Sequence, residues 1–235
     1  MESKKIIAII PARGLSKSIK FKNLKKIKGK TLIELCFNQL KKVSDISDIY
    51  CSTESPRIIG HCKKIGLKYV RRPKKLSSDN SNVFYTVKHT LNYLKSNFNN
   101  IYKYVILVQP TSPFFLSKQV KLLIKKIKKK RKFSSVQTVH KTPHNYHFLN
   151  SRIISDDYIK FKFNKERTKK YNKQKKEIVY SFGNLCITET NKLLKSKNFF
   201  CKPSGYVEID RFTSYDLDSL DDFNFLESVY YLFKK

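Results

Sequence analysis

The sequence predicts an α/β protein, built as a three-layer sandwich around a mainly parallel sheet. Two short and strongly apolar runs, 6–10 and 104–108, have the composition of strands that are buried on both faces. Each run is followed by a polar loop and then by a segment with helical periodicity, and this order recurs up to about residue 139. Because parallel strands need helical crossovers, the helices are expected to cover both faces of the sheet.

Helix signals mark the segments between the strands. Thr31 suits the N-cap of a helix over 31–43, and Pro56 and Gly66 suit the first turn and the C-cap of the next helix. Apolar residues at 120, 123, 124 and 127 predict an amphipathic helix whose solvent face is lysine. The other expected helices are 82–94, 190–195 and 221–233, the other expected strands are 49–52, 67–70 and 134–139, and apolar order returns at 178–187 and 206–209.

Residues 141–176 differ from the rest of the chain, because they are rich in Asn, Lys, His and aromatic residues without clear periodicity. We expect a single domain over 1–235, in which 141–185 forms an arm, a lid or a dimerisation and sugar-binding subdomain. His140, His144 and His147 lie at its start, without carboxylates or cysteines at ligand spacing. They are expected to be loop histidines rather than a metal site.

Length and composition are those of a globular protein. The 235 residues are 40% hydrophobic, which is enough to bury a substantial core. No apolar run approaches the roughly 20 residues of a membrane span, and the first apolar run is too short for a secretory signal. We therefore expect a cytoplasmic protein without a membrane partner. The five cysteines are an odd number and contain no C-x-x-C pair, which predicts buried free thiols.

The charge balance is strongly basic, with 50 Lys and Arg against 18 acidic residues and a formal net charge of +32. Such an excess suggests nucleic acid or an anionic membrane as a partner. The lysines are scattered through every expected helix and loop, however, which favours a compositional bias over a designed footprint. No specific nucleic acid is expected. The alternative, a nucleic-acid-binding protein on this scaffold, would bind DNA or RNA with a steep salt dependence.

The loop after the first strand concentrates positive charge. It contains Arg13, Lys17 and Lys22 together with Ser16, and Gly14 supplies conformational freedom. In open α/β sheets, ligands bind at the carboxyl ends of the strands. The loop chemistry therefore indicates a polyanion, most simply a nucleoside triphosphate, although a basic surface loop would have the same composition.

Two further segments carry functional groups near expected strand ends. Asp216 and Asp218 are spaced i, i+2, so that on a strand both carboxylates face the same side, where two oxygen ligands suit Mg²⁺. An exposed edge with two acids, or a helix N-cap, is the alternative. Gln109 has the amide donor and acceptor needed to contact a cytosine edge or to orient a sugar, and otherwise would only hold its loop together.

Five separated segments, taken in order, resemble the nonulosonate cytidylyltransferases, the family of CMP-sialic acid synthetases (acylneuraminate cytidylyltransferases). The segment PARGLSKSIKFKN at 11–23 is similar to the family signature P-A-R-G-G-S-K-G-x-x-x-K-N, and QPTSP at 109–113 matches its Q-P-T-S-P. DLD at 216–218 looks like its D-I-D, and the remaining segments are STE at 52–54 and RP at 72–73 with Asp79. The resemblance covers nearly the whole chain.

The resemblance implies a Rossmann-like sheet of the nucleotide-diphospho-sugar transferase type and a homodimer. It also implies transfer of CMP from CTP to a nonulosonic acid, with release of pyrophosphate and with Mg²⁺ as cofactor. Its implied catalytic residues are Arg13, Lys22, Asp216 and Asp218, of which the two aspartates also hold the metal. The nucleotide would contact Arg13, Ser16, Lys17, Lys22, Asn23, Arg72, Ser81 and Gln109. The sugar would contact Gln109, Lys173, Gln174 and Tyr180.

The chain departs from the family pattern at several positions. Leu15 and Ser18 stand where the family has glycines, and a side chain costs roughly a kilocalorie per mole or more if the loop needs positive φ there. The family's Arg-Gln is Lys173-Gln174, and an arginine that holds the sugar carboxylate falls near Ser181. The acceptor could therefore be N-acetylneuraminate, pseudaminate, legionaminate or another nine-carbon acid. The alternatives are another nucleotide, an eight-carbon keto acid, or a catalytically degenerate relative.

Overall fold

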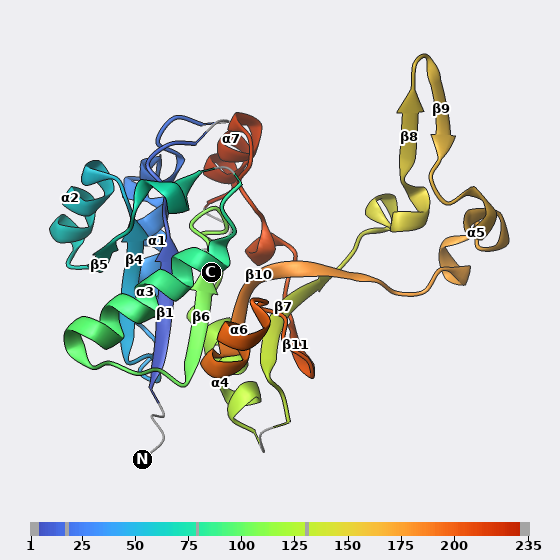
Figure 1. Ribbon diagram of the computed structural model, residues 1–235. Helices are drawn as coiled ribbons and strands as arrows, with labels where there is room; N and C mark the ends of the chain where they lie inside the picture. The colour runs from blue at the N-terminus through green and yellow to red at the C-terminus, as the bar shows by residue number, and fades with distance from the viewer. Residues whose placement is uncertain (1–4, 17–18, 79, 130–131, 231–235) are drawn as a thin grey trace.

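The structure is a computed structural model that describes residues 5–16, 19–78, 80–129 and 132–230. Within these residues the main sheet has seven strands in the order β11-β7-β10-β6-β1-β4-β5 (Figure 1). Their bounds are β1 Ile6–Pro11, β4 Asp48–Thr53, β5 Lys68–Arg71, β6 Tyr104–Val108, β7 Ser135–Lys141, β10 Tyr180–Glu189 and β11 Ser204–Glu208. The short strands β2 Lys26–Ile27 and β3 Lys30–Thr31 pair with each other beside the first loop.

The sheet is mainly parallel, as the sequence predicts. β1 lies between β6 and β4 and pairs with both in parallel, and β4 pairs in parallel with β5. β10 is the exception, since it pairs antiparallel with both β6 and β7. The chain leaves the sheet along β7 and returns along β10, so that this connection needs no helical crossover.

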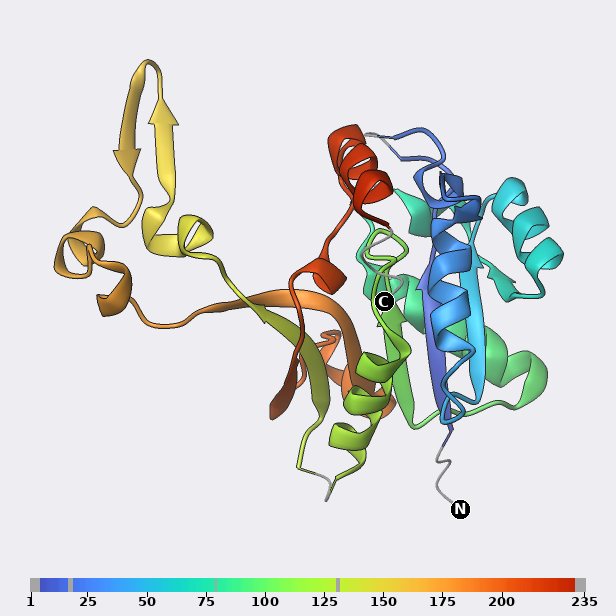
Figure 2. The same ribbon diagram turned by 180° about the vertical axis from the view of Figure 1, so that it is seen from behind.

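Helices cover both faces of the sheet and complete the three predicted layers (Figures 1 and 2). Along β1 the side chains alternate between the two faces. Ile6, Ala8 and Ile10 pack in the core under α1, α2 and α4, whereas Ile7 and Ile9 pack in the core under α3 and α6. The helix bounds are α1 Leu32–Leu40, α2 Pro56–Ile65, α3 Val83–Phe98, α4 Ser117–Lys128, α5 Asn164–Lys169, α6 Thr190–Ser196 and α7 Leu220–Val229.

The helix ends follow the chemistry that the sequence predicts. The Thr31 side chain caps α1 by accepting a hydrogen bond from the Glu34 N–H, and Gly66 ends α2 with a left-handed φ of 69°. All five cysteines are buried free thiols, which confirms that prediction. None of the described helices has both the length and the hydropathy to cross a bilayer.

A separate arm projects from the sheet between β7 and β10 (Figures 1 and 2). It contains the hairpin of β8 Arg152–Ser155 and β9 Tyr158–Phe161, followed by α5. Ile154 and Ile159 face each other across the hairpin and are 74% and 63% exposed. The segment therefore is an arm in this structure, and its secondary structure is more regular than its sequence pattern suggests.

Candidate active site

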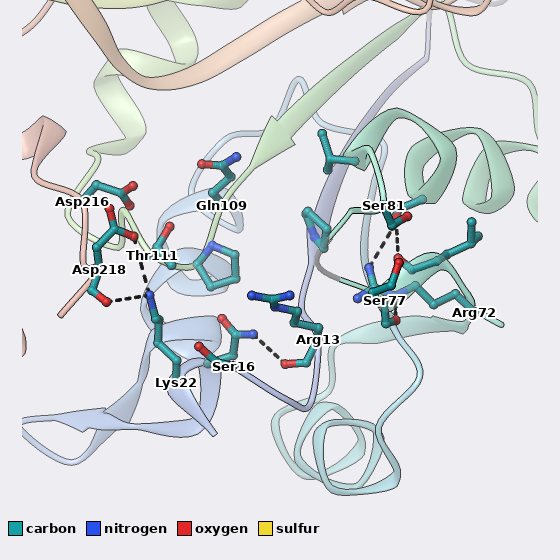
Figure 3. Close-up of a pocket in the computed structure, with 17 residues that line it drawn as sticks. Arg13, Ser16, Lys22, Arg72, Ser77, Ser81, Gln109, Thr111, Asp216 and Asp218 are labelled. Carbon is teal, nitrogen blue, oxygen red and sulfur yellow. Dashed lines mark hydrogen bonds and ion pairs between the residues drawn. The ribbon is translucent and has the colours of Figure 1, made fainter. Parts of the chain in front are cut away.

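A cavity of about 400 Å³ opens at the carboxyl edge of the sheet, where β1, β5 and β6 end (Figure 3). This is the edge at which open α/β sheets bind ligands. The cavity brings together residues from four separated segments of the chain, within 11–23, 72–86, 109–111 and 216–218. Those predicted from the sequence are Arg13, Ser16, Lys22, Asn23, Arg72, Ser81, Gln109, Asp216 and Asp218. Lys17 and Ser18 lie outside the described residues.

The basic loop and the acidic segment meet directly at Lys22. Its side chain is only 9% exposed, and its Nζ donates to the Leu217 carbonyl oxygen at 2.8 Å. It also donates to the Asp218 carbonyl oxygen at 3.3 Å (Figure 3). The Asp218 carboxylate is 3.7 Å away but is 83% exposed, so solvent screens this ion pair. Ile19 and Leu217 also belong to one apolar cluster with α1 and α7, which holds the two segments side by side.

The acidic segment, residues 216–218, lies in no strand of the described chain, so strand geometry does not place the two carboxylates. Besides the two bonds from Lys22, its backbone is anchored by a hydrogen bond from the Leu217 N–H to the Thr111 carbonyl at 2.9 Å and by one from the Asp218 N–H to Asp222 Oδ2 at 3.1 Å. Leu217 is fully buried, and Asp216 and Asp218 on either side of it both line the cavity. The predicted convergence of the two carboxylates therefore holds, for a different reason. Ser112 Oγ donates to Asp216 Oδ1 at 3.0 Å.

The loop path shows how the chain tolerates Leu15 in place of a glycine. Leu15 has no positive φ and its side chain is 78% exposed, so it does not fill the cavity. Among the residues of this loop that the structure describes, Phe21 is left-handed, with φ 54°, and the Arg57 guanidinium lies 4.4 Å from its ring centre. Asn23 Nδ2 donates to the Arg13 carbonyl at 2.9 Å, so its amide also holds the loop together.

Glu54 joins two parts of the site, a role that sequence reasoning missed. Its Oε1 accepts from the Gly14 N–H at 2.7 Å, and its Oε2 lies 3.1 Å from Arg72 Nη2 and accepts from Ser77 Oγ at 2.5 Å. Burial acts to raise the pKa of Glu54, but the hydrogen bonds from Ser77 and Gly14 and the Arg72 charge bring the pKa below its ordinary value. Only the three-dimensional contact reveals this role.

The predicted sugar-binding residues of the arm do not line this cavity. Lys173 lines a separate cavity of about 290 Å³ at the base of the arm, together with Lys176 and His144. Tyr180 begins β10 opposite Lys141. Gln174 lies in the short 3₁₀ helix Lys173–Lys175 and is exposed. Within one chain, therefore, these three side chains are not brought to Gln109.

A smaller cavity of about 250 Å³ adjoins the larger cavity of about 400 Å³ described above, because Asp216 and Asp218 line both. Its other lining residues are His140, Arg211, Ser214, Tyr215 and Asp222. His140 is the sixth residue of β7 and shares a 3.0 Å hydrogen bond with Ser214 Oγ, so its expected place in a loop is wrong. Burial, and then the charge of Arg211, lower the pKa of His140.

The two aspartates fit a magnesium site of the kind that substrate completes. Among the described residues, no three His, Cys, Asp or Glu side chains gather as a metal cage. Mg²⁺ is usually bound by one or two carboxylates, with waters and substrate phosphates as its other ligands. Asp216 and Asp218 supply that donor set at the wall of the larger cavity.

Cations, hydroxyls and two carboxylates surround one cavity at the carboxyl edge of a mainly parallel α/β sheet, an arrangement that suits a nucleotide and a metal ion. The chain matches the family model described as "Cytidylyltransferase" over residues 7–218, and it belongs to this family. The relatives support the nonulosonate branch that the motifs predict. The chain is 28% identical over 221 residues to the N-acylneuraminate cytidylyltransferase of Escherichia coli O18:K1:H7, and the match covers 93% of this chain and 50% of that protein.

Other relatives differ in the sugar acid that their names carry. The pseudaminic acid cytidylyltransferase of Campylobacter jejuni is 28% identical over 234 residues, with 96% of each chain covered. The 3-deoxy-manno-octulosonate cytidylyltransferase of Elusimicrobium minutum is 29% identical over 136 residues, with 58% of this chain and 51% of that protein covered. The chain thus spans about half the length of two of these relatives and nearly all of the third.

Solved structures confirm the fold. The CMP:2-keto-3-deoxy-manno-octonic acid synthetase complexed with CTP superposes with a TM-score of 0.73 at 13% identity, covering 97% of this chain and 99% of that one. The 4-diphosphocytidyl-2C-methyl-D-erythritol synthase of Anaerococcus prevotii gives a TM-score of 0.64 at 17% identity, with 97% and 96% covered. At such low identity the likeness concerns the fold.

Proposed function

We propose that the protein transfers CMP from CTP to a nonulosonic (sialic-type) acid and releases pyrophosphate. The observation that carries this proposal is the contact between Lys22 and the acidic segment at a shared cavity. Cations for a triphosphate and carboxylates for a metal thereby line one wall of the same space. Membership of the cytidylyltransferase family, and the name cytidylyltransferase that the relatives carry, support CTP as the nucleotide.

Different residues of the cavity have different roles in the proposed reaction. Arg13 and Lys22 neutralise the phosphates, and Lys22 keeps one donor beyond its two backbone bonds. Asp216 and Asp218 would hold Mg²⁺, which when bound neutralises charge on the phosphates and orients them. Arg72 and Ser81 line the cavity on the side away from the acidic segment, and Gln109 lies between that side and Asp216 (Figure 3); the three would bind the base and ribose. Such chemistry depends on positioning and charge neutralisation.

The identity of the acceptor is the finer part of the proposal. The Lys22-Asn23 pair and QPTSP favour a nine-carbon acid, as do the N-acylneuraminate and pseudaminic acid relatives. The 3-deoxy-manno-octulosonate relative makes an eight-carbon acid the alternative. A panel of nine-carbon and eight-carbon acids therefore tests the acceptor directly.

The test measures pyrophosphate release from CTP, UTP, GTP and ATP with Mg²⁺ and each acid. We expect release with CTP and a nonulosonic acid. Asp218→Asn is expected to reduce the rate at least roughly 100-fold, while the thermal midpoint stays near that of the wild type because the carboxylate is exposed. No release with any acid, together with no CTP-dependent thermal shift, would sink the proposal. CTP binding without turnover would instead indicate a degenerate relative.

We also propose that the arm pairs with a second copy of the chain. A two-stranded hairpin by itself is only marginally stable in water, and this one exposes Ile154 and Ile159 on its surface. Sedimentation velocity should show twice the 27.8 kDa chain mass. Ile154→Glu with Ile159→Glu should give monomers, while Leu122→Glu on the exposed face of α4 should not. A monomeric wild type would refute the pairing.

Because the proposed reaction requires CTP, the cytoplasm is the expected location of the protein.

A further inference from the structure

The smaller cavity beyond Asp216 and Asp218 is positioned to receive the acceptor. The larger cavity holds the cations for the triphosphate, and the two aspartates form the wall that both cavities share. A group that reacts with a phosphate near this wall can therefore extend into the smaller cavity. The inference below rests on the proposed function for the identity of that group.

The chemistry of a nonulosonic acid places a negative charge at this wall. Its reacting hydroxyl and its carboxylate are bonded to the same carbon atom, so the carboxylate must lie close to the reacting oxygen. Two protein carboxylates already lie there, and a third negative charge would be repelled unless a cation compensates it. A cation in the smaller cavity, which Lys22 does not line, would add to the compensation that a metal at the two aspartates supplies and would offset the nearby Asp222 as well.

Arg211 is the cation in that position. It lines the smaller cavity together with His140, and its guanidinium carbon lies 5.3 Å from the centre of the Tyr146 ring. In the described part of the chain its guanidinium forms no ion pair with an acid. An aromatic face beside it can orient the planar group without consuming its donors.

The backbone that carries Arg211 is held at several points. Ser214 Oγ donates to the Arg211 carbonyl at 2.7 Å and shares a 3.0 Å hydrogen bond with His140 Nδ1. Asn184 Nδ2 donates to the Thr213 carbonyl in the same turn, and Thr138 Oγ1 contacts the Asn184 amide oxygen at 3.0 Å. This turn is therefore fixed to β7 and β10, while the Arg211 side chain remains exposed to an incoming ligand.

We propose that Arg211 binds the carboxylate of the acceptor sugar acid. The planar guanidinium can donate two parallel hydrogen bonds to a carboxylate, which a lysine cannot. This assignment supplies a carboxylate partner from within the chain, at a position that Lys173 and Gln174 do not reach in one copy. It makes Arg211 a determinant of specificity for acids over neutral sugars.

The test compares Arg211→Gln and Arg211→Lys with the wild type and with Arg71→Gln, a control at an exposed arginine of β5. We expect Arg211→Gln to raise KM for the acid roughly 10-fold to 100-fold, Arg211→Lys to raise it less, and both to leave KM for CTP within about twofold. The wild type should prefer the acid over its methyl ester, and Arg211→Gln should abolish this preference. An unchanged KM and an unchanged acid-to-ester preference would overturn the inference.

A binding measurement separates this inference from the proposed function. Saturation-transfer NMR with CMP, Mg²⁺ and the same acids needs no turnover. If no nucleotide transfer occurs but acid binding is lost in Arg211→Gln, the proposed function fails and the inference stands. If transfer occurs and acid binding is equal in both proteins, the function stands and the inference fails. Absence of acid binding to the wild type contradicts the inference.

Discussion

Lys22 is a buried amine whose two hydrogen bonds run to the backbone of the acidic segment. Hydrogen bonds to charged groups are worth more than neutral ones, and a buried carbonyl that loses its donor is destabilising. The loop sequence predicts Lys22 as a phosphate ligand. Its second role, as a tether, depends on residues 195 positions later and is not visible in the loop.

Lys22→Met tests this tether. We expect the free energy of unfolding to fall by about 2 kcal/mol and CTP affinity to fall at least roughly tenfold, because both the tether and a phosphate partner are lost. Chemical denaturation and calorimetric titration with CTP measure the two effects. Lys26→Met, at an exposed lysine of the neighbouring β2, should change neither. Wild-type stability in Lys22→Met would contradict the tether.

Gly14 occupies a position that has no room for a side chain. A Cβ built on it would lie 2.6 Å from Ser55 Cβ, although its φ is not in the left-handed region. Gly14→Ala should therefore destabilise the protein by about 1–3 kcal/mol and weaken CTP binding. The matched control is Gly60→Ala within α2, where a Cβ meets nothing within 4 Å and should stabilise by about 0.5–1 kcal/mol. Equal effects of the two changes would refute the steric explanation.

At the scale of elements, Glu54 connects the end of β4 to the loop after β1 and to Arg72 after β5. Its pKa is lowered in the folded protein, from an ordinary value of 4.5. The stability that this carboxylate contributes is therefore fully present above about pH 4.5 and is lost as the pH falls through the lowered value. Arg72 is then left buried without its counter-charge.

Glu54→Gln is expected to remove this part of the acid sensitivity. Thermal midpoints measured from pH 7 to pH 3 should be lower for the variant near neutral pH, and the difference from the wild type should shrink below about pH 4.5. A gap that stays constant over this range would show that the ionisation of Glu54 contributes nothing. Glu34→Gln, at an acid in the first turn of α1, serves as the control.

Elements with strong local signals were predictable, and those set by tertiary context were not. The buried strands β1 and β6 and the caps Thr31 and Gly66 follow from local composition. The hairpin β8–β9 was missed because its two strands are largely exposed and show no clear apolar alternation, although Asp156, at φ 52°, is of a residue type that tolerates a left-handed turn. The i, i+2 spacing of Asp216 and Asp218 would place both acids on one side of a strand, yet buried Leu217 rather than strand pairing holds this segment at the cavity.

At the scale of the whole molecule, the order of strand, loop and helix predicted the sheet and the edge that carries the site. Nine of the predicted residues line the larger cavity, since motif order and strand ends are linear features of the sequence. Glu54, His140 and Arg211 received no role in the sequence analysis. Each acts through neighbours that are distant in the chain, and only the fold brings them together.

The net charge of +32 makes a further prediction about the whole molecule. If the lysines are a compositional bias, DNA and RNA binding should be weak, insensitive to sequence, and lost near roughly 200 mM salt. CTP binding should survive the same salt, because the cations of the cavity are fixed and partly buried. Fluorescence anisotropy with labelled oligonucleotides checks this. Tight, sequence-dependent binding at that salt would favour a nucleic-acid function.

The central claim is that the basic loop and the acidic segment hold one metal-bound triphosphate between them. A crystal structure of the protein with CTP and Mg²⁺ measures this directly. The account predicts triphosphate density in contact with Arg13 and Lys22, and a metal joining it to Asp216 and Asp218. A nucleotide bound elsewhere, with no phosphate within reach of these four side chains, would contradict it.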